Sequence, residues 1–395
     1  MTQKKVTNIG ILEFHFHIKY LHTTMRICKT PQTNVTVFTT KDILKRIETY
    51  IDDKSKYEFI LKEENESINS FLTRVEKICN EKIELLLVNT IQTSMIDIPR
   101  YFKFNPKCKT ILTVHMVNHW MKTRFSFNIK NPARCIDANI SMFFIKRILP
   151  KFNAISVIYS PLKDFIKQNT NYQKPVYVLP FNFYDEKQKI QSKKKDDIVR
   201  IVLPGLIEEY RRDYTGALNV FERLFEKYGK KIQLCILGKP VGASGEKIIN
   251  KCKELKDKGY NIVYYTGFVP EEEYNKKLVE CDIIFSPLHT VTKRETGINE
   301  IYGKTEGSAL PFEAIQYTKP LIVPNKFNVI DELKNSTLTY KNQDELEKIL
   351  RDAIENKNKL EKLKQNAKNN SKKYFSIDVL QKYFTTEILQ KLNEL

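Results

Sequence analysis

Short, unbroken runs of apolar residues recur along this chain, and helix-like segments separate each run from the next. The segments at 84–88, 232–237 and 321–323 contain such runs, which are LLLV, LCIL and LIV. An unbroken apolar run indicates a strand that is covered on both faces. Regular alternation of such strands with helices predicts parallel sheets that carry helices on both faces. We therefore expect an α/β fold in which ligands bind at the carboxyl ends of the strands.

A polar segment divides this pattern into two similar halves. Residues 186–197 contain almost no apolar side chain, which is typical of an exposed linker. At 395 residues the chain also exceeds the length that one hydrophobic core usually serves. We expect a first domain at 1–185, a second domain at 198–375, and a final helix within 376–395 that returns to the first domain.

Composition limits the binding partners and the cellular compartment that we expect for the protein. Lys and Arg exceed Asp and Glu by 66 to 47, a net charge of +19, which favours anionic partners but also fits an ordinary solvated surface. No recognised nucleic-acid motif accompanies the charge, so we expect no nucleic-acid partner. The 7 cysteines form no C-x-x-C pair, and no apolar stretch is long enough to span a membrane. We expect a cytoplasmic protein, either soluble or peripheral on the inner face of a membrane.

Two segments of the first half mix basic and aromatic residues. They are HWMKTRFSFNIK at 119–130 and MFFIKRILPKF at 142–152. Such a segment either contacts an anionic membrane and a lipid-linked acceptor or buries its phenylalanines against the sheet. We favour burial, because a strand follows the second segment directly.

Residues 301–324, IYGKTEGSALPFEAIQYTKPLIVP, combine a loop, a helix start and a buried strand. Gly303 and Gly307 allow sharp turns, and Pro311 suits the first turn of a helix. The free amides of a helix start favour an anion such as phosphate, and Glu313 adds a carboxylate that suits sugar hydroxyls. The plainer alternative is that Glu313 only satisfies the helix dipole.

Four segments give the chain a family resemblance. They are LPGLIEEYRRDYTGALNVF at 203–221, CILG at 235–238, YTGFVPEEEYNKKLVECDIIFSP at 265–287, and the stretch at 301–324. The chain resembles the glycosyltransferase family 4-like (group 1) enzymes. That resemblance implies the GT-B fold, in which two Rossmann-like doubly wound domains face each other across a cleft. It covers the second half almost throughout, and only ILTVH, VIYSPLKDFI and VLPFN carry it in the first half.

The resemblance implies a nucleotide-sugar donor site in the second half. Gly205 ends a strand and allows close backbone approach to a diphosphate, and Gly238 ends the next strand. Arg212 falls where the family has its diphosphate-binding lysine, and Arg211 stands beside it. The family's arginine directly after the first glycine is absent. Surface charge is the alternative role of the two arginines.

The same resemblance indicates which residues bind the ribose of the nucleotide. Glu313 matches the second glutamate of the family's paired-glutamate motif, which holds the ribose hydroxyls. The first glutamate would fall at position 305, where this chain has Thr305 and places Glu306 one residue later. Glu306, Thr305 or backbone amides would take over this contact, or the donor site is impaired. Gly307 and Ser308 are further expected loop contacts.

Histidines of the first half are the remaining candidates. His115 ends a strand in a T-x-H context that resembles the family's active-site histidine, which implies contact with the transferred sugar. A neutral imidazole can share a hydrogen bond with a hydroxyl, although a lone histidine at a strand end is often structural. His15 and His17 occupy the first strand–helix turn, where such enzymes receive the acceptor.

Together these expectations describe a hexosyltransferase-type glycosyltransferase. It would move a sugar from a UDP- or GDP-linked donor to a glycan or lipid-linked acceptor in cell-surface polysaccharide or glycoconjugate synthesis. The resemblance implies retention at the anomeric carbon. The chain has no D-x-D and no histidine–acid cluster with metal spacing, so we expect neither a metal ion nor a cofactor. A catalytically impaired nucleotide- or glycan-binding protein and a sugar-nucleotide epimerase remain open alternatives.

Overall fold

The computed structural model describes residues 6–122, 132–186, 196–292 and 298–393. The chain divides into two compact units, the first of residues 1–182, 293–307 and 377–395 and the second of residues 183–292 and 308–376. Segment 293–307, which the sequence assigned to the second domain, therefore groups with the first unit. Most of the expected linker, at 187–195, lies outside the described residues.

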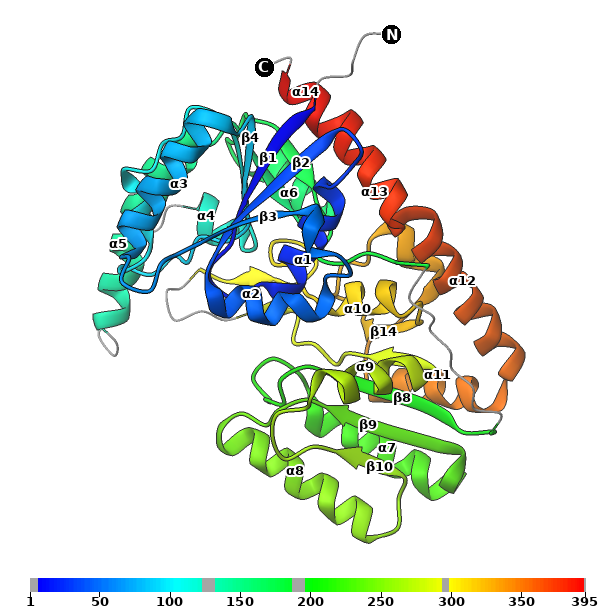
Figure 1. Cartoon of the computed structure of the whole chain (residues 1–395). Helices are drawn as coiled ribbons and strands as arrows, with labels where there is room; N and C mark the ends of the chain where they lie inside the picture. Colours follow the sequence, from blue (N-terminus) through cyan, green and yellow to red (C-terminus); the bar gives the residue numbers. More distant parts are fainter. Residues whose placement is uncertain (1–5, 123–131, 187–195, 293–297, 394–395) are drawn as a thin grey trace. The chain divides into compact units, whose positions relative to one another are not determined.

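The first unit is built on a parallel sheet that has seven strands among the described residues, in the order β3-β2-β1-β4-β5-β6-β7. The strands are β1 Thr7–Leu12, β2 Thr33–Thr39, β3 Glu58–Leu61, β4 Leu85–Val88, β5 Lys109–Thr113, β6 Ala154–Val157 and β7 Val176–Val178. Helices surround this sheet in Figure 1. They are α1 Ile18–Cys28, α2 Lys41–Ile47, α3 Ile68–Lys82, α4 Val117–Met121, α5 Pro132–Ile148, α6 Ser160–Asn169, α13 Ile377–Tyr383 and α14 Gln390–Asn393. Short 3₁₀ turns η1 Glu48–Tyr50, η2 Lys54–Lys56, η3 Ile98–Phe102 and η4 Leu149–Lys151, the π-helical segment η7 Phe384–Leu389 and the short strand β13 Glu300–Ile301 complete the unit.

The second unit repeats this plan with a parallel sheet of six described strands in the order β10-β9-β8-β11-β14-β15. The strands are β8 Val199–Pro204, β9 Ile232–Leu237, β10 Ile262–Tyr264, β11 Ile283–Phe285, β14 Leu321–Pro324 and β15 Thr337–Tyr340. The helices are α7 Tyr214–Tyr228, α8 Gly242–Asp257, α9 Glu271–Glu280, α10 Leu310–Gln316, α11 Gln343–Glu355 and α12 Lys357–Phe375, with η5 Gly229–Lys231, η6 Asp331–Ser336 and the short strand β12 Val291–Thr292. Its core packs α7 and α11 against the sheet.

Both sheets reverse their strand order at the same point. The reversal lies between β1 and β4 in the first unit and between β8 and β11 in the second. This is the strand order of Rossmann-like doubly wound folds, which bind ligands outside the carboxyl ends of the strands at the reversal. The predicted fold class, two doubly wound α/β units, is confirmed.

Some elements differ from the sequence-based expectation. The charged sequence of residues 343–373 predicts one long helix. In the structure Asn356 separates α11 from α12, and its side chain accepts a hydrogen bond from Lys359 N–H. An asparagine that caps a helix start favours this break. The edge strands β3 and β15 were missed, because their half-buried side chains lack the unbroken apolar run of a central strand.

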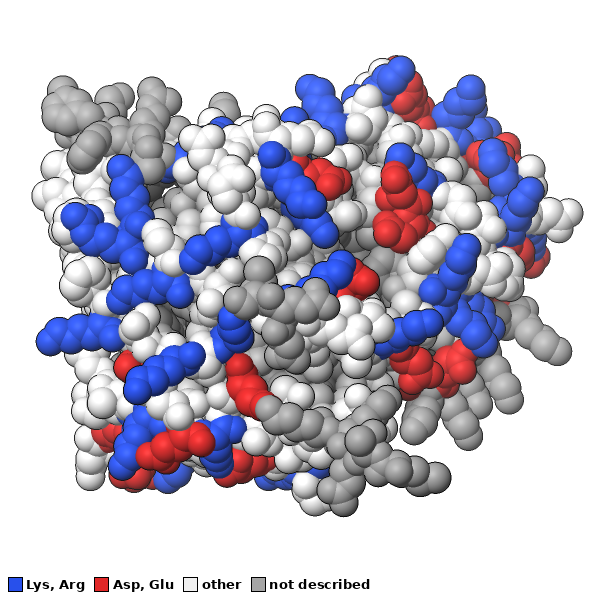
Figure 2. Space-filling model, turned by 90° about the horizontal axis from the view of Figure 1, so that it is seen from above, with Lys and Arg blue, Asp and Glu red and all other residues white. Residues whose placement is uncertain are grey.

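The basic residues are widely distributed. Figure 2 shows Lys and Arg side chains spread over the face that it presents, with acidic side chains between many of them. Exposed ion pairs among the described residues include Lys41–Glu64 and Lys82–Glu58, each at 2.6 Å. Such pairs contribute little to stability because water screens them.

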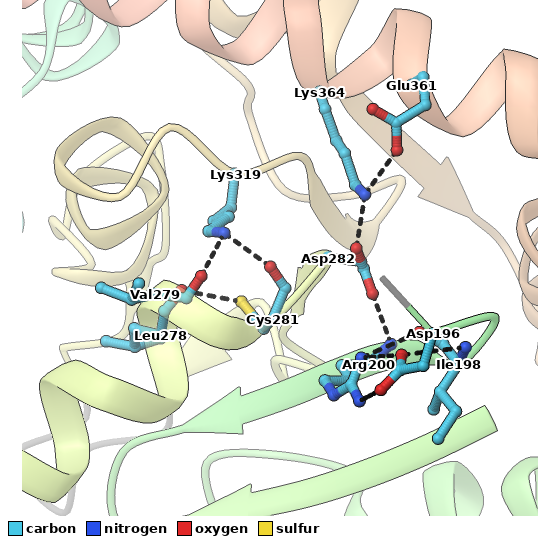
Figure 3. Close-up of polar contacts among 10 residues, drawn as sticks. All are labelled: Asp196, Ile198, Arg200, Leu278, Val279, Cys281, Asp282, Lys319, Glu361 and Lys364. Atoms are coloured by element: carbon cyan, nitrogen blue, oxygen red, sulfur yellow. Dashed lines mark hydrogen bonds and ion pairs between the residues drawn. The ribbon is translucent and has the colours of Figure 1, made fainter. Parts of the chain in front are cut away.

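A polar network holds the amino ends of β8 and β11 in the second unit, at the opposite end of the sheet from the reversal-point loops. Figure 3 shows Lys364 of α12 reaching Asp282, whose other carboxylate oxygen accepts from Arg200 N–H at 2.8 Å. Lys319 donates to the carbonyls of Val279 and Cys281, both at 2.7 Å, at the end of α9. A cation at a helix C-terminus satisfies carbonyls that have no partner within the helix.

Candidate active site

Polar side chains gather where the strand order of the first unit reverses. Glu13 and His17 follow β1, Asn89 and Thr90 follow β4, and His115 follows the neighbouring strand β5. The sequence predicted the two histidines here. Glu13, Asn89 and Thr90 were missed, although each follows a strand that was predicted.

Thr90 links His17 to Glu13. Its Oγ1 lies 2.8 Å from Nδ1 of His17, and the same hydroxyl donates to the Glu13 carboxylate. Because a threonine hydroxyl has one proton, Oγ1 must accept from Nδ1–H of His17. Nε2 of the neutral His17 ring is therefore left as a hydrogen-bond acceptor.

Glu13 is a carboxyl group without exposure to solvent. Its side chain is 0% exposed, and its Oε1 accepts from the His15 backbone N–H at 2.7 Å. Burial raises the pKa of Glu13 to about 7, although the hydrogen bonds from Thr90 and the local backbone act in the opposite direction. Glu13 therefore gains and loses its proton near neutral pH.

His115 packs against His17. The two ring centroids are 4.3 Å apart, and Nε2 of His115 lies 3.0 Å from the carbonyl oxygen of Asn89. Because a carbonyl only accepts, Nε2 carries the proton and Nδ1 is the acceptor. Burial lowers the pKa of His115 to about 4, and burial followed by the neighbouring His115 lowers that of His17 to about 2. Both rings are neutral at pH 7.

His15 has different surroundings from His17. Its ring centroid is 4.4 Å from that of Phe14, and burial lowers its pKa, with Asp97 and Arg100 as the next influences. Of the two histidines predicted to meet the acceptor, His17 is the one whose ring contacts His115.

Loop 298–307 of the first unit carries a second buried carboxyl group, Glu300, which the sequence did not single out. It is 0% exposed and accepts from the backbone N–H groups of Asn118 and His119 at 3.2 and 2.7 Å. Burial raises the pKa of Glu300 to about 7, and the hydrogen bond from Thr305 partly offsets this. Glu300 thereby attaches the loop to the start of α4.

Thr305 forms its hydrogen bonds within the first unit. It is 0% exposed, its Oγ1 accepts from Ile301 N–H at 2.8 Å, and its carbonyl accepts from Val117 N–H at 2.8 Å. Asn118 Nδ2 is a further donor at 3.3 Å. The hydroxyl at the position of the family's first glutamate is therefore engaged by the protein itself.

The next two loop residues lie beside the end of β5. Glu306 is 6% exposed, and its backbone forms an isolated bridge with Met116. Gly307 N–H donates to the His115 carbonyl at 3.4 Å. These two predicted contacts are thus attached next to His115 within the first unit.

Two glycines shape the reversal point of the second unit. Gly205 follows β8 with φ +110°, and a Cβ on Gly238 after β9 would lie only 1.8 Å from the Gly205 carbonyl oxygen. Neither position accommodates a side chain without backbone movement. The ends of β8 and β9 therefore lie close to each other.

Arg212 folds over Gly205. Its Nη1 donates to the Leu206 carbonyl at 2.9 Å, and its Nη2 lies 2.7 Å from where a Gly205 Cβ would be. The Nε–H of Arg212 is buried and has no hydrogen-bond partner among the residues that the structure describes. Arg211 points to Glu208 instead, at 3.7 Å. Of the two predicted arginines, Arg212 is the one at the glycine turn.

Glu313 lies in the first turn of α10 and is 9% exposed. Its carboxylate accepts from the Tyr274 hydroxyl at 2.6 Å, and burial together with Glu313 raises the pKa of Tyr274 well above its usual value. Arg212 acts on Tyr274 in the opposite direction, so these groups share one region of the second unit. Ser308 Oγ accepts at 3.4 Å from the N–H of Leu310, the first residue of this short helix.

Three further features bear on the site. No cluster of three or more His, Cys, Asp or Glu side chains among the described residues has the arrangement of a metal site. Within the same residues, no helix combines the length and apolarity needed to cross a lipid bilayer. A hollow of about 960 Å³ lies between α3 and η3, but none of the predicted site residues lines it.

Comparison with known proteins identifies the second unit. The family of glycosyl transferases group 1 matches residues 184–370, the range that holds Gly205, Arg212 and Glu313. This part of the chain belongs to the group 1 glycosyl transferases. No curated protein sequence matches the chain.

The likeness to solved structures extends over the whole chain. TarM has a TM-score of 0.63 at 10% identity, over 98% of this chain and 99% of that one. Anabaena Alr3699/HepE in complex with UDP and glucose has a TM-score of 0.60 at 12% identity, over 98% and 100%. The lipopolysaccharide outer core galactosyltransferase WaaB has a TM-score of 0.58 at 13% identity, over 98% and 100%. The chain therefore has the GT-B fold.

Proposed function

We propose that the protein transfers a hexose-type sugar from a UDP- or GDP-linked donor to a glycan or lipid-linked acceptor. The transfer proceeds without a metal ion and with retention at the anomeric carbon. The family match over residues 184–370 supports the transferase class. The likeness to HepE, which was solved in complex with UDP and glucose, supports a UDP-sugar donor. The likeness to WaaB, a lipopolysaccharide outer core galactosyltransferase, supports a cell-surface glycoconjugate.

The observation that carries the donor site is the position of Arg212 over Gly205. A guanidinium group with a buried, unpartnered Nε–H can donate to a diphosphate, and its charge stabilises the leaving group as the glycosidic bond breaks. The two glycines let the ends of β8 and β9 lie close together, with the Arg212 guanidinium group directly beside Gly205. Glu313, held by Tyr274, is the acceptor proposed for the ribose hydroxyls.

The sugar and the acceptor are proposed to meet the two neutral histidines. His17 offers Nε2 and His115 offers Nδ1 as hydrogen-bond acceptors, which suits hydroxyl groups of a sugar. Neither ring brings a charge that would need a counter-ion. We place this reaction on the cytoplasmic side of a membrane, at its surface.

One observation favours a second candidate, a nucleotide-binding protein without turnover. Thr305 stands at the position of the family's first glutamate, and its buried hydroxyl is already bonded to the first unit. A contact to the ribose that the family uses would then be missing, while the diphosphate contacts remain.

Incubation with a panel of UDP- and GDP-linked sugars tests the proposal. Release of free nucleotide, with Arg212→Ala lowering the rate at least tenfold, is the expected result. Tight nucleotide binding without release would favour the second candidate instead. A changed sugar that stays attached to its nucleotide would mean epimerisation and would contradict transfer.

A further inference from the structure

We propose that helix α5 and the chain around η3 form a docking surface for an anionic membrane. This α5 surface is defined by six exposed apolar side chains. They are Met95, Ile96, Phe102, Ile136, Ile140 and Phe143. Figure 1 shows α5 at the outer edge of the first unit. The inference names the contact surface for the peripheral location proposed above, and it rests on that location but not on the sugar chemistry.

The exposed residues of α5 form one stripe. Ile136, Ile140 and Phe143 follow a spacing of four and three residues, which places them on the same helix face, and they are 56%, 37% and 48% exposed. The residues that pack into the unit, Met142 and Ile145, are only 7% and 3% exposed. The helix is therefore apolar on two faces, one inside the unit and one in solvent.

This finding corrects a sequence-based interpretation. The segment at 142–152 was expected to bury its phenylalanines against the sheet. Phe152 is 4% exposed, as expected, but Phe143 is 48% exposed. The other basic-aromatic segment, at 119–130, lies from residue 123 onward outside the described residues.

The stripe continues onto the segment of this chain at and before η3. The Phe102 ring of η3 lies 5.7 Å from the Phe144 ring of α5, in an edge contact. Met95 N–H donates to Asp137 of α5 at 2.6 Å. The apolar side chains that precede or belong to η3 therefore extend the same surface.

Positive charge accompanies these apolar side chains. The Arg147 guanidinium carbon lies 3.5 Å from the Phe143 ring centroid, and Lys151 Nζ lies 5.3 Å from that of Phe102. Lys103 and Lys146 are exposed beside them. An acid of the same region, Asp97, is paired with Arg100 at 2.6 Å.

This combination distinguishes an anionic bilayer from a purely apolar partner. Exposed isoleucines and phenylalanines can enter the boundary of the acyl chains, while the lysines and arginines beside them reach the phosphate groups. Attraction to anionic lipid also adds with each basic side chain near the surface. An apolar groove of a protein partner would leave the cations without a match.

Vesicle sedimentation of the full chain tests the surface without any sugar nucleotide. We expect binding to vesicles of phosphatidylcholine with phosphatidylglycerol to be at least tenfold tighter than to phosphatidylcholine alone. Ile140→Ser with Phe143→Ser should weaken it at least tenfold, and so should Lys103→Gln with Lys146→Gln. Equal binding to both kinds of vesicle would overturn the proposal.

Matched variants of the second unit are the controls. Phe268 is 81% exposed and Lys247 and Lys253 are exposed on α8, so Phe268→Ser and Lys247→Gln with Lys253→Gln make similar chemical changes elsewhere. We expect these variants to sediment with anionic vesicles as the unaltered protein does. An equal loss in the controls would show a nonspecific charge effect and contradict the α5 surface.

A fluorescence measurement gives an independent result. The only tryptophan, Trp120, is 6% exposed, so a Trp120→Phe background allows a Phe143→Trp probe to be followed alone. Its emission should shift to shorter wavelength on anionic vesicles, because the indole leaves water. An unchanged emission with bound vesicles would place the contact elsewhere. Self-association that the Ile140→Ser and Phe143→Ser changes abolish would assign the surface to a second copy of the chain instead.

UDP binding separates this inference from the proposed function. Failure of vesicle binding with intact UDP binding would remove only the α5 surface. Loss of UDP binding with intact vesicle binding would remove only the donor site.

Discussion

At the scale of single residues, the first unit contains imidazole groups that burial keeps neutral and carboxyl groups whose pKa burial raises. Glu13 and Glu300 are each 0% exposed, and the pKa of each is raised to about 7 by burial. His17 and His115 have pKa values lowered to about 2 and about 4. The two rings therefore act through hydrogen bonds with a defined direction and carry no charge at neutral pH.

Thr90→Val tests the hydrogen-bond chain from Glu13 to His17. Valine keeps the shape but removes the hydroxyl, so Nδ1 of His17 loses its acceptor and its tautomer is no longer fixed. We expect the ¹⁵N resonances of the His17 ring to show a mixture of tautomers, and the free energy of unfolding to fall by about 1–3 kcal/mol. Thr90→Ser should retain the Nδ1–H tautomer. If the His17 ring resonances of Thr90→Val are identical to those of the unaltered protein, the hydrogen bonds from Glu13 through Thr90 to His17 are ruled out.

Glu300→Gln tests the buried carboxyl group through pH. The folded-state pKa of about 7 exceeds the usual value of 4.5. The protonated carboxyl group therefore makes its full contribution to the free energy of unfolding below pH 4.5, and this contribution is lost as the pH rises to about 7. The stability of the unaltered protein relative to the variant should therefore fall by about 3 kcal/mol across that window. Urea unfolding followed by Trp120 fluorescence reports the first unit. A difference that does not vary with pH would contradict the assignment.

At the scale of elements, the amino ends of β8 and β11 are held by charged side chains, whereas their carboxyl ends carry the candidate donor site. Lys364 of α12 contacts Asp282 at 2.5 Å, and the side chains of these residues are 28% and 18% exposed. The network shown in Figure 3 thereby joins a long surface helix to the first residues of two central strands.

Lys364→Met measures what this network contributes. Methionine keeps the apolar stem but leaves the partly buried Asp282 without its cation, so we expect a loss of about 1 kcal/mol in the free energy of unfolding of the second unit. Lys368→Met, an exposed position of the same helix, should change it by less than about 0.5 kcal/mol. Hydrogen exchange of the amides of β8 and β11 localises the effect. Equal losses in both variants would remove the special role of Lys364.

The elements that the sequence predicted are those with unbroken apolar runs. Central strands such as β4 and β9 were found because burial on both faces leaves a signal within each strand. The contact between Thr90 and Glu13 joins residues 77 positions apart, and no local pattern records such a contact. Residue type and strand position were enough to predict the histidines as candidates. The direction of their hydrogen bonds depends on which atoms the fold brings together, and the sequence does not record this.

At the scale of the whole molecule, the chain uses one strand order twice and gives the two copies different chemistry. The first unit presents neutral rings and the buried carboxyl group of Glu13 at its reversal point, and the second presents a guanidinium group over a glycine turn. Group 1 glycosyl transferase membership rests on residues 184–370. The central claim is that Arg212 holds the diphosphate of the donor.

Titration calorimetry of the full chain with UDP and GDP tests that claim most directly. We expect Arg212→Ala to weaken binding of the preferred nucleotide at least tenfold, about 1.4 kcal/mol, because the diphosphate loses its cation. Arg223→Ala on α7, which removes an exposed pair with Glu347, and His115→Ala in the first unit should leave the affinity within about twofold. Unchanged affinity in Arg212→Ala, or an equal loss in Arg223→Ala, would contradict the account.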